Sequence, residues 1–475
     1  MRNVSRVLSF LMFFLCLVFV LPAQTFSERQ EIAIFRLSFY GQPSVPPPPG
    51  VRVEIRGRHG SLSVHLRGTG NPAYDDLFAR AFGSVDEQIR SVFINLGRFD
   101  VIGMQQRLTQ ESVDDFIAAL SDYRATEAEI PEAVLLGQQA FTERDFRQLA
   151  GGFIVVIPSV SWFDLRRDRN GRYTAEMQTS FTFIDVREGR TFGQFFIESS
   201  GASDRAEAAV RSAVDALPGE LSFRVRSMPE FQLRTGILEV TGREVLVEFG
   251  RNMGLQRGDE YAIVAERVLA TGHIAAKETG LIVIREVQED FSYARIIYAN
   301  PRARVGDQLQ EVPRRGFETQ IYYDVLTDGL RLSSLLGVKA VASRGFYDWR
   351  PFGAIEIPFR GAIVADGAPF FPLNMVIGGE WNAFVGRLRI TPSASVGLGG
   401  AVPLGSESDR DTFYLTHFGG VARLTGSLLL GRDVLVSVQT GLGYWVSVFD
   451  ERTTQIYPPL AGYGGLVIGG GVTLK

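Results

Sequence analysis

The sequence predicts a multidomain α/β plus all-β protein whose last third, residues 317–475, is an antiparallel transmembrane β-barrel of about eight strands. The first observation is a two-residue alternation in that stretch, with apolar side chains on one face and charged or small ones on the other. The second is that the connections between alternating segments are short and long in turn, as in outer-membrane barrels. The third is an N-terminal segment typical of exported proteins.

Residues 1–23 are predicted to be a signal peptide. Arg2 and Arg6 precede an apolar run over residues 7–21, and Ala23 offers a small residue at a cleavage point. An uncleaved anchor helix is the alternative, but this run is shorter than the ~20 residues that a spanning helix needs. The only cysteine, Cys16, lies inside the run, so we expect the exported chain to use no disulfide.

The bulk composition limits the classes of function. Lys+Arg number 49 and Asp+Glu 53, a balance that gives no reason to expect a nucleic-acid partner. Hydrophobic content of 45% and charged content of 21% indicate a folded chain, and 475 residues indicate two to four domains. No later apolar run approaches the length of a spanning helix, so a membrane location requires a closed barrel.

Residues 24–228 are expected to form one α/β domain. The predicted strands are 31–39, a hairpin within 51–67, 98–102, 152–160, 173–186 and 191–198. The predicted helices are 71–96, one from 112, 143–150 and 204–217. The run 152–160 is apolar throughout, which is expected of a strand covered on both faces.

Three segments of this domain, 94–102, 151–159 and 181–190, carry a resemblance to a known family. They resemble packing landmarks of periplasmic α/β domains found in the curli secretion channel (CsgG), the Tol-system β-propeller protein and the flagellar assembly protein T. The resemblance covers about residues 30–225. It implies an assembly platform without catalytic residues, and this chain departs from the curli channel by lacking its lipid-anchor cysteine.

Residues 229–313 are expected to form a small SH3-like β module. Short strands surround two Gly-Asp turns, Gly258-Asp259 and Gly306-Asp307, each of which closes onto a strand. The ordered set resembles the C-terminal domain of the flagellar assembly protein T.

The barrel strands are expected near 317–326, 334–343, 351–360, 372–382, 384–399, 414–428, 434–448 and 461–475. Their connections at 344–350, 382–384 and 431–433 are short. The connections at 361–371, 403–413 and 450–460 are long. Because outer-membrane barrels have short periplasmic turns and longer outer loops, this pattern places the first two domains in the periplasm.

One face of the predicted strands is apolar and the other carries charge. The outward candidates are Ile321, Tyr323, Val338, Ile355, Ile357, Phe359, Met375, Ile377, Trp381, Leu388, Ile390, Val396, Val436, Val438, Leu442, Ile468, Val472 and Leu474. The charged lumen cluster is Lys339, Glu356, Arg360, Glu380, Arg387, Arg389 and Arg423, with Glu318, Gln320, Asp324 and Gln439 as further lumen candidates.

The mixed signs of this cluster favour a plugged anchor. An eight-stranded barrel has room only for its own side chains, and unpaired buried charge is expensive. A solute path through Arg387, Arg389 and Arg423 is the alternative. A soluble lipocalin-like cup is another, because alternation alone does not show which face looks outward.

The sequence predicts no catalytic, cofactor-binding or metal site. His59, His65, His273 and His417 have no ligand spacing and are interpreted as surface or loop residues. The adjacent carboxylates at 75–76 and 114–115 suit helix starts, and the Gly-x-Gly clusters do not open a helix. We therefore expect a protein that is not an enzyme and holds no cofactor.

The functional hypothesis is a non-enzymatic scaffold or assembly protein of the bacterial cell envelope, with its barrel in the outer membrane and its other domains in the periplasm. Its expected partners are outer-membrane lipid and periplasmic or outer-membrane proteins, including further copies of this chain. Two alternatives stay open. One is an oligomeric export channel or porin-like pore, and the other is a soluble periplasmic binding protein with a lipocalin-like barrel.

Overall fold

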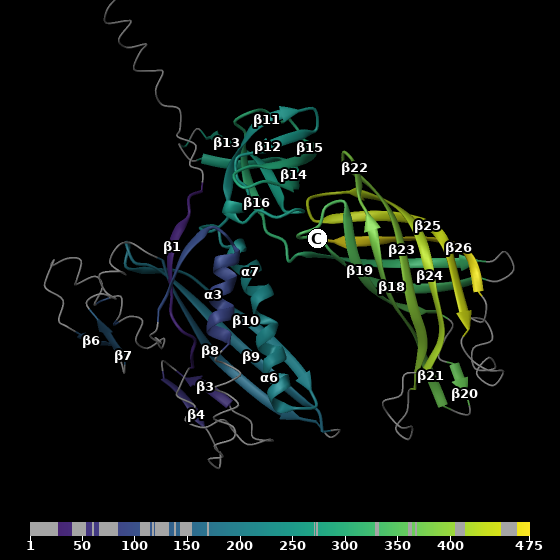
Figure 1. The fold of residues 1–475 in the computed structure, drawn as a ribbon, viewed down its shortest axis with the longest axis horizontal. Helices are drawn as coiled ribbons and strands as arrows, with labels where there is room; N and C mark the ends of the chain where they lie inside the picture. The colour runs from purple at the N-terminus through teal and green to yellow at the C-terminus, as the bar shows by residue number, and fades with distance from the viewer. Residues whose placement is uncertain are drawn as a thin grey trace, which may run out of the picture.

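The computed structural model describes residues 27–39, 54–58, 61–65, 84–104, 115, 118, 133–136, 139–142, 154–168, 171–269, 271, 274–327, 332–359, 363–365, 368–403, 414–447 and 463–475. They form a mixed sheet with helices, a six-stranded barrel and an eight-stranded barrel, with the smaller barrel beside one end of the larger (Figure 1). The predicted signal peptide lies outside the described residues.

The mixed sheet has the strand order β10-β9-β8-β1-β5. Its strands are β1 (Gln30–Ile34), β5 (Phe99–Gly103), β8 (Ile154–Arg167), β9 (Tyr173–Asp185) and β10 (Arg190–Ser203), and β2 (Ser38–Phe39) also pairs with β8. The strand β1 runs parallel to both of its neighbours, whereas β8, β9 and β10 form an antiparallel meander. Two separate hairpins are β3 (Glu54–Arg58) with β4 (Ser61–His65), and β6 (Ala133–Leu136) with β7 (Gln139–Thr142).

Among the described residues, three helices pack against this sheet: α3 (Val85–Asn95), α6 (Ala206–Asp215) and α7 (Leu217–Ser227). In α3 the buried residues Val85, Ile89, Val92 and Phe93 recur at three and four, so one stripe faces the core. They meet a cluster of phenylalanines that includes Phe183 from β9. A complete α/β sandwich over 24–228 goes beyond the described residues, and most of the helices predicted from 112 to 150 fall outside them.

The six-stranded barrel closes in the order β11-β12-β15-β14-β13-β16. Its strands are β11 (Arg234–Thr241), β12 (Glu244–Val247), β13 (Glu260–Val268), β14 (Ile274–Val287), β15 (Ser292–Ala299) and β16 (Gln308–Val312), with the short 3-10 helix η2 (Arg251–Met253) between β12 and β13. Gly258 and Gly306, the two glycines of the Gly-Asp turns, both have positive φ (84° and 85°), a conformation that favours glycine.

The eight-stranded barrel is antiparallel throughout. Its strands are β17 (Phe317–Thr327), β18 (Leu332–Ala342), β19 (Trp349–Pro358), β21 (Ala368–Trp381), β23 (Leu388–Pro403), β24 (Tyr414–Leu429), β25 (Val434–Ser447) and β26 (Tyr463–Leu474). Pairing of β17 with β26 and of β21 with β23 closes the ring. The predicted fold class of an eight-stranded antiparallel barrel is therefore confirmed, and the expected segments match the strands to within a few residues.

Two details of the barrel differ from expectation. The connection predicted as a loop at 361–371 contains β20 (Ile363–Ala365), which pairs with the start of β21 and prolongs the hairpin. The short β22 (Ala383–Val385) pairs with β23 at the opposite end, so the predicted turn after Asn382 is a small hairpin. In both places backbone pairing extends into residues whose composition suggested a turn.

The mixed sheet and the six-stranded barrel meet through backbone contact and buried charge. A Cβ added to Gly254 would lie 1.9 Å from the carbonyl oxygen of Leu96, so only glycine permits this approach. Beside it, Glu311 on β16 receives hydrogen bonds from Arg98 Nη1 at 2.6 Å and Arg226 Nε at 2.6 Å. All three charged side chains are buried, and this ion cluster joins the two bodies.

Candidate functional site in the barrel lumen

The outer wall of the eight-stranded barrel is apolar. The predicted outward residues are exposed on the described strands, with values such as 71% for Val438 and 68% for Leu442, apart from the half-buried Ile357. The intervening positions are largely buried inside the barrel. A continuous apolar outer wall of this extent is unusual for a monomeric protein in water.

A first charge network fills the lumen near the end that faces the six-stranded barrel. Glu318 on β17 receives a 2.7 Å hydrogen bond from Arg389 Nη1 on β23 and lies 3.0 Å from Arg350 Nη1 on β19. Glu380 on β21 pairs with Arg350 and, at 2.9 Å, with Lys339 Nζ on β18. Three cations thus share two carboxylates, and all five side chains are largely or fully buried.

A second network lies deeper in the lumen. Arg423 on β24 donates to Asp324 Oδ2 at 3.1 Å and to Glu356 Oε1 at 2.9 Å. The hydroxyl of Tyr322 donates to the same Glu356 oxygen at 2.6 Å, and Gln439 donates to Asp324. This network carries one cation and two carboxylates, so its net charge offsets that of the first network.

These bonds span the lumen rather than follow its wall. In the closed strand order, β23 is the fourth strand from β17 in either direction, so the Arg389–Glu318 bond crosses the full width of the barrel. Arg423 likewise reaches strands three places away on both sides. Side chains from opposite walls therefore meet, as expected for a barrel of this size.

The distal end of the lumen, away from the smaller barrel, holds His417. Its Nε2 lies 3.2 Å from Asn374 Oδ1, and its ring packs edge-on against Trp445 at 5.2 Å between centroids. A Cβ at Gly399 would lie 1.9 Å from His417 Nε2, so that glycine provides the space for the ring. The interpretation of His417 as a surface or loop residue was wrong, because its side chain is buried in the lumen. His417 lies on the same face of β24 as Arg423, nearer to the distal end of the barrel.

Five residues of the predicted charged cluster, Lys339, Glu356, Glu380, Arg389 and Arg423, belong to these two networks. Arg360 lies outside the described residues. Arg387 was placed in the lumen wrongly: it is exposed, and its guanidinium lies 3.9 Å from the ring centroid of Tyr298 on the six-stranded barrel. The reason is that Arg387 precedes β23 and lies in the turn after β22.

Two members of these networks, Arg350 and Tyr322, were not predicted from the sequence. Arg350 falls in the connection predicted at 344–350, but it continues the alternation of Phe352, Ala354 and Glu356. Extending that pattern by one step towards the N-terminus identifies it. Tyr322 is an aromatic residue between the outward-facing Ile321 and Tyr323, and it lies on the buried face of β17 with Gln320 and Asp324.

The six-stranded barrel covers the near end of the lumen. Glu260 on β13 binds Lys475 and receives a 2.7 Å hydrogen bond from Arg314 Nη2, and Arg344 Nε pairs with Asp259 at 3.0 Å. Burial disfavours the charged form of Glu260, but Lys475 and Arg314 outweigh it and hold the pKa of this carboxyl below its ordinary value. Charged groups from the larger barrel are thus neutralised by carboxylates of the smaller one.

Apolar packing completes this contact. Tyr347, Leu429 and Leu435 from the larger barrel are buried in one cluster with residues of the smaller barrel that include Leu281 and Ile297. A Cβ at Gly258 would lie 2.2 Å from the carbonyl oxygen of Ser343, so backbones also touch here. We call these contacts, together with the Glu260 and Asp259 ion pairs, the cap interface.

Within the described residues no group of three or more His, Cys, Asp or Glu side chains could hold a metal ion. None of the helices that the structure describes is long and apolar enough to cross a membrane.

No protein-family model matches this chain, and a search of curated proteins finds no match. Among solved structures, Neisserial surface protein A is similar at 12% identity and TM-score 0.25, over 34% of this chain and 97% of that one. A Xanthomonas campestris protein of the DUF330 family gives 12% and 0.20, over 42% and 85%. The outer membrane channel DcaP of Acinetobacter baumannii gives 8% and 0.17, over 64% and 84%. Likeness at this level carries no conclusion about function.

Proposed function

We propose that this protein is an outer-membrane anchor of the bacterial envelope, whose plugged eight-stranded barrel holds a rigid periplasmic scaffold. The observation that carries the proposal is the Arg389–Glu318 bond across the full width of a lumen whose outer wall is apolar. Charge inside and hydrocarbon outside is the distribution that a lipid environment stabilises and that water does not.

The side of the membrane follows from the connections. The short connections at 343–348, 382–387 and 430–433 lie at the end that contacts the six-stranded barrel. Because outer-membrane barrels have short turns on the periplasmic side, the smaller barrel and the mixed sheet belong in the periplasm. The cap interface then joins the membrane anchor to the periplasmic domains.

The scaffold role rests on the resemblance of about residues 30–225 to the CsgG-like periplasmic domains and of the module at 229–313 to SH3-like modules. Its partners would be envelope proteins or further copies of this chain. The contacts between the domains support this role. The ion cluster at Glu311 joins the mixed sheet to the six-stranded barrel, and the cap interface joins the six-stranded barrel to the eight-stranded one.

The porin-like alternative needs an open path, and the two charge networks together with the cap interface oppose one. A conductance measurement in planar bilayers separates the two proposals. The purified full chain is expected to run as a monomer that shifts in mobility on boiling and to conduct no ions. An SDS-resistant oligomer with discrete single-channel steps would overturn the plugged anchor.

Surface proteolysis tests the orientation. A protease site inserted after residue 408 in the distal connection 403–413 is expected to be cleaved in intact cells. The same site inserted after Gly431, in a turn at the cap interface, is expected to be cleaved only after the outer membrane is permeabilised. Protection of the distal site in intact cells, with cleavage after permeabilisation, would refute the proposed topology.

A further inference from the structure

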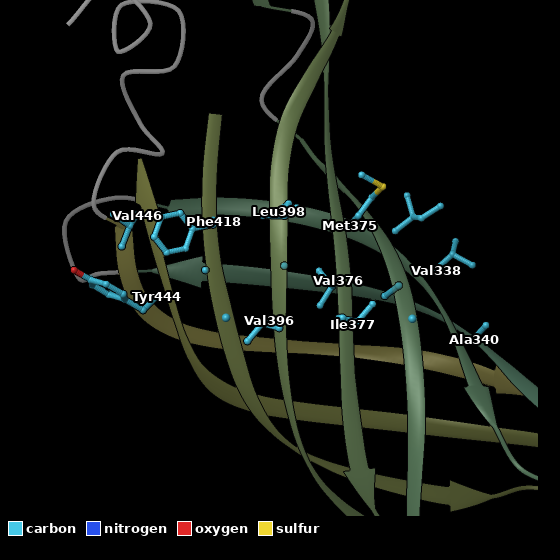
Figure 2. A pocket seen from close by; sticks show the side chains of 16 residues that line it. Val338, Ala340, Met375, Val376, Ile377, Val396, Leu398, Phe418, Tyr444 and Val446 are labelled. Carbon is cyan, nitrogen blue, oxygen red and sulfur yellow. The ribbon is translucent and has the colours of Figure 1, made fainter. Parts of the chain in front are cut away.

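An apolar groove crosses the outer wall of the eight-stranded barrel. One row of residues lies side by side on six consecutive strands, each opposite the next in the strand register: Ala340, Gly353, Ile377, Val396, Gly420 and Tyr444. The adjacent row includes Met375, Leu398 and Phe418. Together they border a groove of about 1110 Å³ (Figure 2).

Three of the six residues in the first row are small: Ala340, Gly353 and Gly420. Gly353 and Gly420 flank the exposed pair Ile377 and Val396, and a Cβ at Gly353 would meet only one atom, the Val376 carbonyl oxygen at 3.9 Å. Among the described residues that line the groove none is charged, and Tyr444 supplies their one polar side-chain atom. An occupant therefore gains apolar contact and almost no hydrogen bonding.

The groove runs obliquely from one end of the barrel to the other. Ala340 lies two residues before the end of β18, next to the cap interface, whereas Tyr444 lies three residues before the distal end of β25. The Tyr444 side chain is 62% exposed, and its hydroxyl points away from the other lining residues (Figure 2). A tyrosine with an apolar ring and a free polar tip is typical of a membrane–water boundary.

We propose that this groove holds an acyl chain of a membrane lipid, with the lipid headgroup at the Tyr444 end. The proposal rests on the proposed membrane location, because the groove is continuous with the apolar wall that would face lipid. A second copy of this chain fits less well. A two-fold dimer through this face would set groove against groove and leave an unfilled space, which forfeits the packing contacts that stabilise an interface.

The test uses fluorescent labels in the full chain, whose single cysteine, Cys16, lies in the predicted signal peptide. Ala340→Cys reports on the groove. Val472→Cys is the matched control: it lies on β26, outside the groove, and like Ala340 it is two residues from the end of its strand near the cap interface. Both variants are labelled with bimane and placed in phosphatidylcholine vesicles that contain increasing fractions of acyl-chain-brominated phosphatidylcholine, which quenches bimane on contact.

Preferential occupancy predicts half-maximal quenching at position 340 at a brominated-lipid fraction at least twofold lower than at position 472. Gly353→Phe, which fills the groove where a Cβ has room, is expected to abolish that difference and leave position 472 unchanged. Equal quenching at the two positions before the Phe substitution means ordinary boundary lipid and overturns the proposal. Weaker quenching at position 340 than at position 472 means that protein covers the groove, and this result also overturns the proposal. Absence of quenching at both positions instead contradicts the membrane location.

Discussion

Replacing Glu311 by alanine is expected to destabilise the junction between the mixed sheet and the six-stranded barrel strongly. Glu311 is 3% exposed and accepts hydrogen bonds from Arg98, from Arg226 and from the backbone nitrogen of Leu233. Its removal leaves two buried guanidinium groups without their shared carboxylate. Breaking a buried pair in this way costs about 3–5 kcal/mol.

The depressed pKa of Glu311 corresponds to a similar free energy. Burial disfavours the charged form of Glu311, but Arg98 and Arg226 outweigh it and lower the pKa of its carboxyl to about 2, from an ordinary 4.5. At about 1.4 kcal/mol per pKa unit, this difference corresponds to roughly 3 kcal/mol of folding stability. Because the folded-state pKa is the lower one, that stability is present above pH 4.5 and is lost as the pH falls toward 2.

The assay is urea unfolding of the full chain in detergent, followed through the transition of the mixed sheet and the six-stranded barrel. With a slope of about 1–3 kcal/mol per molar urea, Glu311→Ala is expected to lower the midpoint by more than about 1 M. Glu244→Ala is the control: its pair with Arg285 has the same 2.6 Å separation but is nearly half exposed, so it is worth less than about 1 kcal/mol. Equal shifts of the urea midpoint for Glu311→Ala and Glu244→Ala would refute the reasoning. A Glu311→Gln variant gives a second test, because the unmodified protein loses its charge at Glu311 as the pH falls. A stability difference between this variant and the unmodified protein that does not shrink from pH 4.5 to pH 2 would also refute it.

Two further predictions concern the lumen. Arg389→Ala leaves the buried carboxylate of Glu318 without one of its partners, so it is expected to lower the temperature at which the gel mobility of the barrel shifts. Adding Glu318→Ala is expected to restore part of that loss. A double variant whose shift temperature falls by more than the sum of the two single effects would contradict this coupling. Gly399→Ala places a methyl group against the His417 ring and is expected to destabilise the barrel by about 1–3 kcal/mol in the same assay. Gly426→Ala is the control, because the described part of the structure has no atom within 4 Å of the added Cβ. Equal shifts for the two variants would contradict this prediction and show that the ring moves away freely.

Local pattern was sufficient to predict the barrel strands. A strand is defined by a period of two, which neighbouring residues reveal by themselves, so a strand was predicted at 384–399 from its alternating leucine, isoleucine and arginine, and the structure has it at Leu388–Pro403. The number of barrel strands followed from counting such segments. Arg350 and β20 were missed where an alternating stretch was cut short at residues that resemble a turn.

The direction and partners of each side chain were decided by tertiary structure. Alternation gives two faces but does not say which one faces inward, and the exposed Arg387 differs from the buried Arg389 only because β23 begins between them. Arg389 meets Glu318, 71 residues away, because β17 pairs with β26 and closes the ring at one particular register. Ring closure, and the cap interface that covers its end, depend on contacts between distant strands, and no local pattern of residues encodes those contacts.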